Sequence, residues 1–291
     1  QPDKIEQLIG SGSEQGVKLR YVTEPSPMGT GGAYKYAMGD TPETTVVFNG
    51  DVITDLDVNK LLDFHRARGA TATLTLAPVP NPSRYGLVPI DKSGRITQFL
   101  EKPTDEVRGK LKANTINAGV YVLEPQVLDM IPKDKNRSFE YDVFPEILLR
   151  ELPFFGHVIE DEYWLDIGTP ASYLEAHRDF LAGRIKGFEP AGQDRSEVAT
   201  RAEVDKTSII GEGCVVKPGV RIVNSVIGAG VHVEEKAVID NSVIWSHTRV
   251  AAGAEIDNAV IGRSCHIGRN AIVGSGSVLG DKTSLTDYTK V

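Results

Sequence analysis

Two aspartates stand where the sequence predicts the ends of short strands, and their carboxylates could hold a hard cation. Asp51 follows the apolar strand 46–48 after an Asn-Gly turn, and Asp166 lies in the segment 164–169, just before a helix that begins at a proline. In open α/β sheets, ligands bind beyond the carboxyl ends of the strands. Because Mg²⁺ takes one or two carboxylates together with substrate phosphates, the pair predicts a magnesium site. The alternatives are an ordinary turn at Asp51 and a helix-capping turn at Thr169.

Glu101 and Lys102 follow a second predicted strand, 95–100, and Pro103 ends its pairing. A lysine can neutralise a phosphate as a point charge, and a glutamate can accept hydrogen bonds from sugar hydroxyls. Taken alone, this pair is better explained as two solvated side chains, so its assignment to a site depends on the motifs around it.

The loop 24–32, with the sequence Glu-Pro-Ser-Pro-Met-Gly-Thr-Gly-Gly, precedes a predicted helix at 33–38. Its glycines allow a ligand to approach the backbone closely, and the N-terminus of a helix favours anions. The loop matches neither the G-x-G-x-x-G pattern nor the Walker loop, so it indicates neither a Rossmann dehydrogenase nor a P-loop enzyme.

The last third of the chain carries the clearest structural pattern. Large aliphatic residues recur there in steps of six, six and five, so the pattern closes every 17 residues. Neither a helix nor an ordinary strand gives this spacing. It is typical of a triangular solenoid with one inward aliphatic side chain on each short face. The series is Ile210, Val216, Ile222, Ile227, Val233, Ile239, Ile244, Val250, Ile256, Ile261, Ile267 and Val273.

A second row of small or β-branched residues lies two positions before these aliphatics, which is how a narrow prism fills without voids. Both cysteines, Cys214 and Cys265, fall on this row. A metal pair and a disulfide are the functional alternatives, but small core filler is the favoured interpretation. We also expect that corners need a permissive backbone at the glycines that directly follow an aliphatic, namely Gly211, Gly228, Gly262, Gly268 and Gly280.

Upstream of the solenoid, predicted strands and helices alternate, as in a mainly parallel sheet with helices on both faces. We therefore expect an α/β domain at 1–185, a linker at 186–197 and a β-helix domain at 198–291. The predicted strands are 17–22, 45–48, 71–78, 115–123 and a hairpin of 87–90 with 95–100, and the predicted helices are 3–9, 33–38, 58–68, 141–152 and 170–182.

Composition narrows the class of partner. The 291 residues carry a formal net charge of −8 without a basic cluster, which argues against nucleic acid. No stretch approaches the roughly 18 apolar residues of a membrane span, and no signal peptide is visible. Together with thiols that fit a reducing compartment, this predicts a cytoplasmic protein with small-molecule partners.

Each motif is weak alone, but their order along the chain is specific. The order is Glu-Pro-x-Pro-x-Gly-Thr-x-Gly from Glu24, Asn-Gly-Asp at 49–51, Tyr85-Gly86, Glu101-Lys102-Pro103, Asn-Ala-Gly at 117–119, Glu140-x-Asp142-x-x-Pro145 and Trp164-x-Asp166-x-Gly168-Thr169. It resembles the sugar-phosphate nucleotidyltransferases, or nucleotide-sugar pyrophosphorylases. The repeat behind it resembles the left-handed β-helix of the mannose-1-phosphate guanylyltransferase and glucose-1-phosphate adenylyltransferase branches.

The resemblance implies a Rossmann-like, mainly parallel nucleotidyltransferase sheet followed by a left-handed parallel β-helix of hexapeptide repeats. It implies that a sugar 1-phosphate attacks the α-phosphorus of an NTP, giving a nucleotide sugar and pyrophosphate. The catalytic residues would be Asp51 and Asp166, holding Mg²⁺, and Lys102, binding the sugar phosphate. The sugar pocket would be lined by Tyr85, Gly86, Glu101, Asn117 and Gly119, and the nucleotide would lie against Glu24, Pro27, Gly29 and Thr30.

The sequence departs from the family in one respect. The family opens with a glycine-rich strand and loop that carries a catalytic arginine, followed by a Pro-Lys segment, and neither occurs in these 291 residues. We therefore expect the polypeptide as it stands to lack the triphosphate-binding loop and to be inactive by itself, while its parent protein is the enzyme.

Glu24 bears on the choice of nucleotide. An ionised carboxylate offers only acceptors, and guanine presents two adjacent donors, whereas uracil and thymine present one donor between two acceptors. We therefore expect GTP with mannose 1-phosphate, giving GDP-mannose. The alternatives are a glucose-1-phosphate thymidylyl- or adenylyltransferase and a non-catalytic, nucleotide-sugar-binding regulatory subunit of the same fold. Because flat prism faces and an open end coil expose strand edges, we also expect a homo-oligomer formed through the β-helix.

Overall fold

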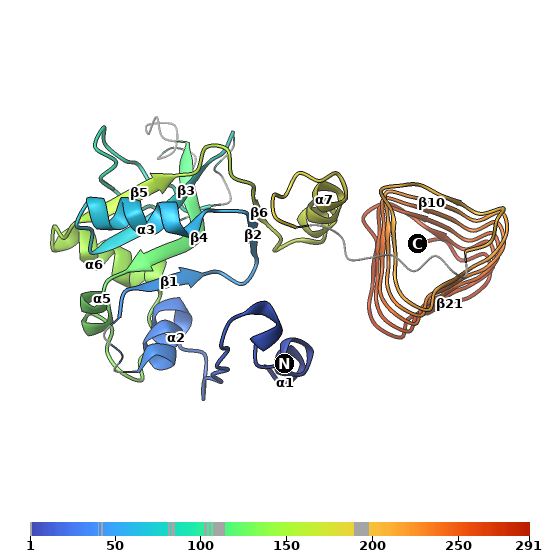
Figure 1. The fold of residues 1–291 in the computed structure, drawn as a ribbon, viewed down its shortest axis with the longest axis horizontal. Helices are drawn as coiled ribbons and strands as arrows, with labels where there is room; N and C mark the ends of the chain where they lie inside the picture. The colour runs from blue at the N-terminus through green and yellow to red at the C-terminus, as the bar shows by residue number, and fades with distance from the viewer. Residues whose placement is uncertain are drawn as a thin grey trace. The chain divides into compact units, whose positions relative to one another are not determined.

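The computed structural model describes residues 2–39, 41, 43–80, 82, 85–101, 104, 106, 114–188 and 198–291. The chain divides into two compact units. Residues 1–49 with 57–160 form the first unit, and residues 50–56 with 161–291 form the second. Figure 1 shows the elements of both.

The first unit is built on a four-stranded sheet with the order β1-β4-β3-β5. β4 is antiparallel to both of its neighbours, whereas β3 and β5 are parallel. β1, β3 and β5 therefore share one direction, but only the β3–β5 pairing is parallel, so the sheet is mixed and not mainly parallel as predicted. β4 runs the other way, and the described residues between β3 and β4 include an antiparallel hairpin, in which Leu87 bridges to Leu100 and Ile90 to Ile96. The strands are β1 (Thr45–Phe48), β3 (Ala72–Pro78), β4 (Thr115–Leu123) and β5 (Phe154–Val158).

Helices cover both faces of this sheet. α3 (Val58–Ala67) lies on the face of Thr73, whose Oγ1 is 2.8 Å from His65 Nδ1. Side chains alternate along a strand, so the next residue, Leu74, and its cross-strand partner Tyr121 point to the other face. There the Tyr121 ring packs edge-on against Phe144 at 5.1 Å. The remaining helices of the unit are α1 (Pro2–Ile9), η1 (Ser13–Gln15), α2 (Gly29–Met38), α5 (Pro125–Asp129), the π-helix η2 (Phe139–Val143) and α6 (Phe144–Leu149).

The strand predicted at 17–22 is wrong. The backbone N–H groups of Val17 and Leu19 donate to Gly12 O and Ser11 O, so this segment folds back on its own turn, and it pairs with no strand among the described residues. The hairpin within 87–100 is confirmed by reciprocal hydrogen bonds between Leu87 and Leu100. α2 begins at Gly29, inside the predicted loop, and the helix predicted at 141–152 begins earlier, as η2.

The second unit joins a small antiparallel ribbon and one helix to a solenoid. The ribbon consists of β2 (Val52–Thr54) and β6 (Trp164–Asp166), and the helix is α7 (Pro170–Leu181). No helix in the described part of the chain is long and apolar enough to span a membrane.

The predicted solenoid is confirmed as three parallel sheets of five two- or three-residue strands, one sheet on each face of the prism. Successive strands pair Ile222 with Ile239 and Ile239 with Ile256, which is the 17-residue period. The strands are β7 (Glu203–Val204), β8 (Ile209–Ile210), β9 (Val215–Val216), β10 (Arg221–Val223), β11 (Val226–Ile227), β12 (His232–Val233), β13 (Val238–Asp240), β14 (Val243–Ile244), β15 (Arg249–Val250), β16 (Glu255–Asp257), β17 (Val260–Ile261), β18 (His266–Ile267), β19 (Ile272–Val273), β20 (Val278–Leu279) and β21 (Ser284–Leu285).

The solenoid core is filled as the spacing predicts. All twelve inward aliphatics are at most 1% exposed, and the small row is buried with them. Cys214 and Cys265 are buried thiols on that row, with Sγ 3.0 and 3.2 Å from the carbonyl oxygens of Gly228 and Gly280, so they are core filler.

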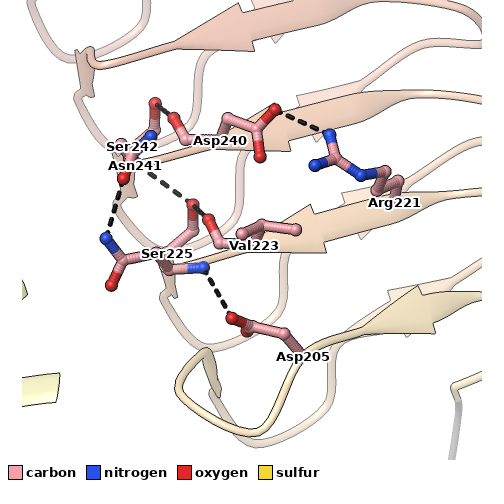
Figure 2. A network of polar contacts seen from close by, with 8 residues as sticks. Asp205, Arg221, Val223, Ser225, Asp240, Asn241 and Ser242 are labelled. Atoms are coloured by element: carbon pink, nitrogen blue, oxygen red, sulfur yellow. Dashed lines mark hydrogen bonds and ion pairs between the residues drawn. The ribbon is translucent and has the colours of Figure 1, made fainter. Parts of the chain in front are cut away.

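Polar side chains connect the coils at one corner (Figure 2). Ser242 N donates to Ser225 Oγ, and Asn224 Nδ2 donates to Asn241 Oδ1 on the next coil. Asn224, Asn241 and Asn258 adopt the left-handed conformation that this short corner requires. On the adjoining face, Arg221 bridges to Asp240 at 2.7 Å.

The glycines that follow the aliphatics are needed for a different reason from the one predicted. None of Gly211, Gly228, Gly262, Gly268 and Gly280 has a positive φ. In all but Gly280, an added Cβ would come within 3 Å of backbone atoms of the next coil. Close stacking of the coils, not backbone freedom, therefore excludes a side chain at these four positions.

Gly228→Ala should lower the free energy of unfolding by about 1–3 kcal/mol, because its Cβ would lie 2.7 Å from Ser246 N and force the coils apart. Gly280→Ala is the matched control, since its Cβ would meet no atom within 4 Å, and should change stability by less than about 0.5 kcal/mol. Urea unfolding followed by circular dichroism measures both, and equal shifts would contradict the stacking explanation.

Candidate functional site

The two predicted metal aspartates lie side by side in the second unit. β2 and β6 pair Val52 with Asp166, and Ile167 N donates to Asp51 O at 2.9 Å. Gly168 N donates to Asp166 Oδ1 at 2.7 Å, which orients that carboxylate. A Cβ placed on Gly168 would lie 2.9 Å from Asp166 Oδ1 and 4.0 Å from Asp51 Oδ2, so both carboxylates face one point beside Gly168.

This pair suits a hard divalent cation. Both groups offer anionic oxygens, the ligands that Mg²⁺ prefers, and Asp51 is exposed while Asp166 is half-buried. Among the described residues no cluster of three or more His, Cys, Asp or Glu side chains could hold a metal by itself. A metal here would therefore take its remaining ligands from water and from substrate phosphates. The capping turn is also present, because Thr169 and Ser172 form a capping box at the start of α7.

In the first unit, Tyr121 connects several of the predicted sugar-pocket residues. Its side chain is fully buried, its hydroxyl accepts from Asn117 Nδ2 at 2.8 Å, and it lies 3.4 Å from Glu140 Oε1. Burial raises the pKa of the Tyr121 hydroxyl well above its ordinary value, and the charge of Glu140 adds to the effect. Gly119 N donates to Asn117 Oδ1, so both the nitrogen and the oxygen of the Asn117 side-chain amide have partners that fix its orientation.

Glu140 also ties this network to the predicted nucleotide loop. Its Oε2 accepts from Thr30 Oγ1 at 2.9 Å and from Ser138 Oγ at 2.6 Å. Thr30 Oγ1 in turn accepts from Phe139 N at 2.8 Å. Thr30 of the predicted nucleotide loop is thus linked through Glu140 and Tyr121 to Asn117 of the predicted sugar pocket.

Glycines bring the rest of the predicted sugar pocket together. A Cβ on Gly86 would lie 2.6 Å from Glu101 Oε2, and Gly86 O accepts from Asn117 N at 3.0 Å. Gly119 has φ +75°, and a Cβ there would meet the Asn49 side chain at 2.9 Å. Tyr85 precedes Gly86 and is half-buried. Tyr85, Gly86, Glu101, Asn117 and Gly119 therefore occupy one region of the unit.

The loop 24–32 packs against the chain's own backbone at 135–137. A Cβ on Gly29 would lie 2.5 Å from Arg137 O, and one on Gly32 would lie 2.5 Å from Lys135 O. Asn136 Nδ2 donates to Pro27 O. Glu24 Oε2 accepts from Met28 N at 2.9 Å, which fixes the turn and the carboxylate. These glycines therefore allow close approach, as predicted, but to another segment of this chain.

Lys102, predicted to bind the sugar phosphate, lies outside the described residues, as does Pro103. The sequence interpretation missed Asn49 and Tyr121 as parts of the site and quoted Glu140 without giving it a role. Asn49 stands directly before the Gly-Asp turn. Tyr121 follows the Asn-Ala-Gly motif by two positions, and a tyrosine at that place in a buried strand is the signal that could have found it.

Tyr121→Phe should lower the free energy of unfolding by about 1–3 kcal/mol, because Asn117 and Glu140 would each lose a partner for a polar group in a buried region. Tyr141→Phe, at a side chain that is 66% exposed, should change it by less than about 0.5 kcal/mol. Thermal melting compares the two, and indistinguishable melting temperatures would show that the network contributes nothing.

Comparison with known proteins assigns the chain to a family. Residues 1–183 match the Nucleotidyl transferase family, and residues 192–291 match the EIF2B subunit epsilon LbH domain. The chain is 36% identical over 230 residues to mannose-1-phosphate guanylyltransferase of Mycobacterium tuberculosis (strain ATCC 25618 / H37Rv), covering 76% of this chain and 62% of that protein. It is 33% identical to mannose-1-phosphate guanylyltransferase 1 of Arabidopsis thaliana, covering 71% and 56%.

A relative named for a different nucleotide, UTP, is similar to this chain at a comparable level of identity. UTP--glucose-1-phosphate uridylyltransferase of Synechocystis sp. is 33% identical, covering 76% of this chain and 62% of that protein. Among solved structures, HddC from Yersinia pseudotuberculosis complexed with GMP-PN matches with a TM-score of 0.50 at 28% identity, over 60% of this chain and 73% of that one. The chain thus spans about three fifths of the length of the M. tuberculosis relative. Because the first family match extends over more than half of its residues, the protein belongs to the nucleotidyl transferase family.

Proposed function

We propose that the protein joins mannose 1-phosphate to GTP, giving GDP-mannose and pyrophosphate. The observation that carries this proposal is the convergence of Asp51 and Asp166 beside Gly168 in a chain of the nucleotidyl transferase family. Two carboxylates at one point suit a metal that also contacts phosphates. Relatives named as mannose-1-phosphate guanylyltransferases support the choice of substrates.

The reaction is an in-line displacement. An oxygen of the sugar 1-phosphate attacks the α-phosphorus of the NTP, the new P–O bond forms, and the bond to the β-phosphate breaks to release pyrophosphate. The attacking oxygen is already anionic, so the chain needs no general base. Mg²⁺, held by Asp51 and Asp166, would supply neutralisation of the phosphate charge. The chain's contribution is to hold and orient the two substrates, which is what such transfers chiefly require.

The sugar side of the site is assigned to the network around Asn117. Glu101 and Asn117 would bind sugar hydroxyls, with Tyr85, Gly86 and Gly119 shaping the pocket around them, and Lys102 would neutralise the sugar phosphate. The fixed orientation of the Asn117 amide supports this assignment, since preorganised groups bind without further ordering.

The base side of the site is assigned to the loop containing Glu24, Pro27, Gly29 and Thr30. Glu24 donates no hydrogen bond and retains acceptor capacity on Oε1 beyond its contact with Met28 N. That arrangement favours guanine, which presents two adjacent donors, over uracil and thymine. The uridylyltransferase of Synechocystis is the observation in favour of a glucose 1-phosphate enzyme, so this alternative is retained.

A second candidate function is a non-catalytic subunit that binds nucleotide sugars. The match of residues 192–291 to an EIF2B subunit epsilon domain favours it. The presence of both aspartates favours catalysis, since a scaffold needs no metal pair. We further infer a cytoplasmic homo-oligomer that associates through the solenoid, with buried cysteine thiols and flat sheet faces in support. We also propose that the nucleotidyltransferase domain ends before a linker at 186–197. This linker falls inside the second compact unit, and its residues 189–197 lie outside the described residues.

Asp51→Asn and Asp166→Asn in the full-length protein should each reduce Mg²⁺-dependent turnover by about a hundredfold or more, because each removes one anionic ligand. Asp57→Asn is the control, since asparagine can replace Asp57 as the N-cap of α3 with little change. Turnover is followed by pyrophosphate release. Unchanged rates in both site variants, from folded protein, would favour the non-catalytic subunit.

Pyrophosphate release by the full-length protein, measured across ATP, CTP, GTP, UTP and dTTP with mannose or glucose 1-phosphate, should be fastest with GTP and mannose 1-phosphate. Glu24→Gln replaces one acceptor with a donor and should reduce the preference for GTP by about tenfold, the loss expected for one charge-assisted hydrogen bond. A preference that does not change would remove Glu24 from the choice of base, and a different best pair would reassign the substrates.

A further inference from the structure

We propose that Asn258 of the solenoid is a positioning residue for the Asp51–Asp166 pair, acting through helix α7. The proposal rests on the proposed function for its consequence, the binding of a metal, but the mechanical link can be tested without it. Asn258 does not touch either aspartate, and the coupling runs in the second unit from the Asn258–Arg178 contact through α7 to the loop that carries Asp166.

The first contact joins the solenoid to the middle of α7. Arg178 Nη1 donates to Asn258 Oδ1 at 2.9 Å. Asn258 is held firmly, because its backbone adopts the left-handed corner conformation, its N–H donates to Asp240 O, and its Nδ2 donates to Ser275 Oγ on the next coil at 2.7 Å. A charged donor on a fixed acceptor is a strong hydrogen bond.

The second link is helix α7 itself, which carries Arg178. Its first turn is closed by Tyr173 N, which donates to Thr169 O at 2.8 Å. Thr169 caps this turn through Ser172. A displacement of the helix therefore reaches Thr169, which is bonded directly to Gly168.

The third link is the carboxylate loop itself. Gly168 N orients Asp166 Oδ1, and Ile167 N binds Asp51 O. On its other side, α7 is fixed by Asp179, whose Oδ2 accepts from the Tyr163 hydroxyl next to β6 at 2.8 Å. α7 is thus held between the ribbon that carries the aspartates and the solenoid, and loss of the solenoid contact leaves the loop supported from one side only.

The test compares Asn258→Gly with Asn241→Gly by hydrogen–deuterium exchange of the Ile167 and Gly168 amides in metal-free, full-length protein. Glycine readily adopts the left-handed backbone conformation of these corner positions, so each variant keeps the backbone and loses only the asparagine side chain. Asn241 occupies the same corner one coil earlier and bonds to Asn224. We expect the Ile167 and Gly168 amides to exchange about fivefold faster or more in Asn258→Gly, which is a usual size for coupling between sites. In Asn241→Gly their exchange rates should change by less than about twofold.

Asn258→Asp is the rescue variant, because it keeps an acceptor for Arg178 and should restore exchange to within about twofold of the unmutated protein. Equal exchange in Asn258→Gly and Asn241→Gly, or no rescue by Asn258→Asp, would overturn the proposal.

A Mn²⁺ titration followed by electron paramagnetic resonance separates this inference from the proposed function. Asn258→Gly should weaken Mn²⁺ binding by about fivefold and raise the half-saturating Mg²⁺ concentration, with KM for the sugar 1-phosphate unchanged. If the unmutated protein binds no Mn²⁺, the metal assignment fails, and the exchange experiment still decides whether the solenoid positions the loop. If the unmutated protein binds Mn²⁺ and the Asn258→Gly variant binds it equally well, the proposal that Asn258 positions the two aspartates is wrong.

Discussion

The antiparallel pairing of β2 with β6 is the contact on which the second unit depends. It joins residues 52–54 to residues 164–166 and assigns an early segment of the chain to the same unit as the solenoid. The entropy of closing so long a loop grows only slowly with its length, so a short ribbon can hold it. One result of this pairing is that Asp51 and Asp166, which are distant in sequence, share a single point beside Gly168.

The solenoid imposes a second constraint, because each coil stacks directly on the next. Stacking leaves no room for a Cβ at Gly228 or Gly268, and it requires buried polar atoms such as Ser225 Oγ to bond between coils. Every coil therefore supports its neighbours, and a side chain such as that of Asn258 is fixed by contacts above and below it. Such a stack suits the role of a rigid support for a helix packed on its surface.

The sequence predicted the solenoid residue by residue, because a 17-residue period has few other structural explanations and each inward position repeats. It placed both aspartates at strand ends, and in the structure Asp51 lies between β1 and β2 and Asp166 is the last residue of β6. The strand expected at 17–22 failed because alternation of apolar residues describes only one half of a pairing, and in the described part of the chain Val17 and Leu19 bond to the turn before them instead of to a strand. Tyr121 was missed for a related reason: its hydroxyl partners, Asn117 and Glu140, lie on the same strand and on η2, and only the folded chain brings them together.

The glycine-rich loop shows where motif interpretation needs the structure most. Gly29 and Gly32 are fully accounted for by the backbone at 135–137, which a side chain at either position would strike. Glycines alone are therefore weak support for a ligand at this loop. The stronger support comes from side chains that keep acceptor capacity after their internal contacts are made, which Glu24 does, and from the link between Thr30 and Glu140. Through Glu140 and Tyr121 that link continues to Asn117, so a ligand that ordered the loop would also reinforce the network assigned to the sugar.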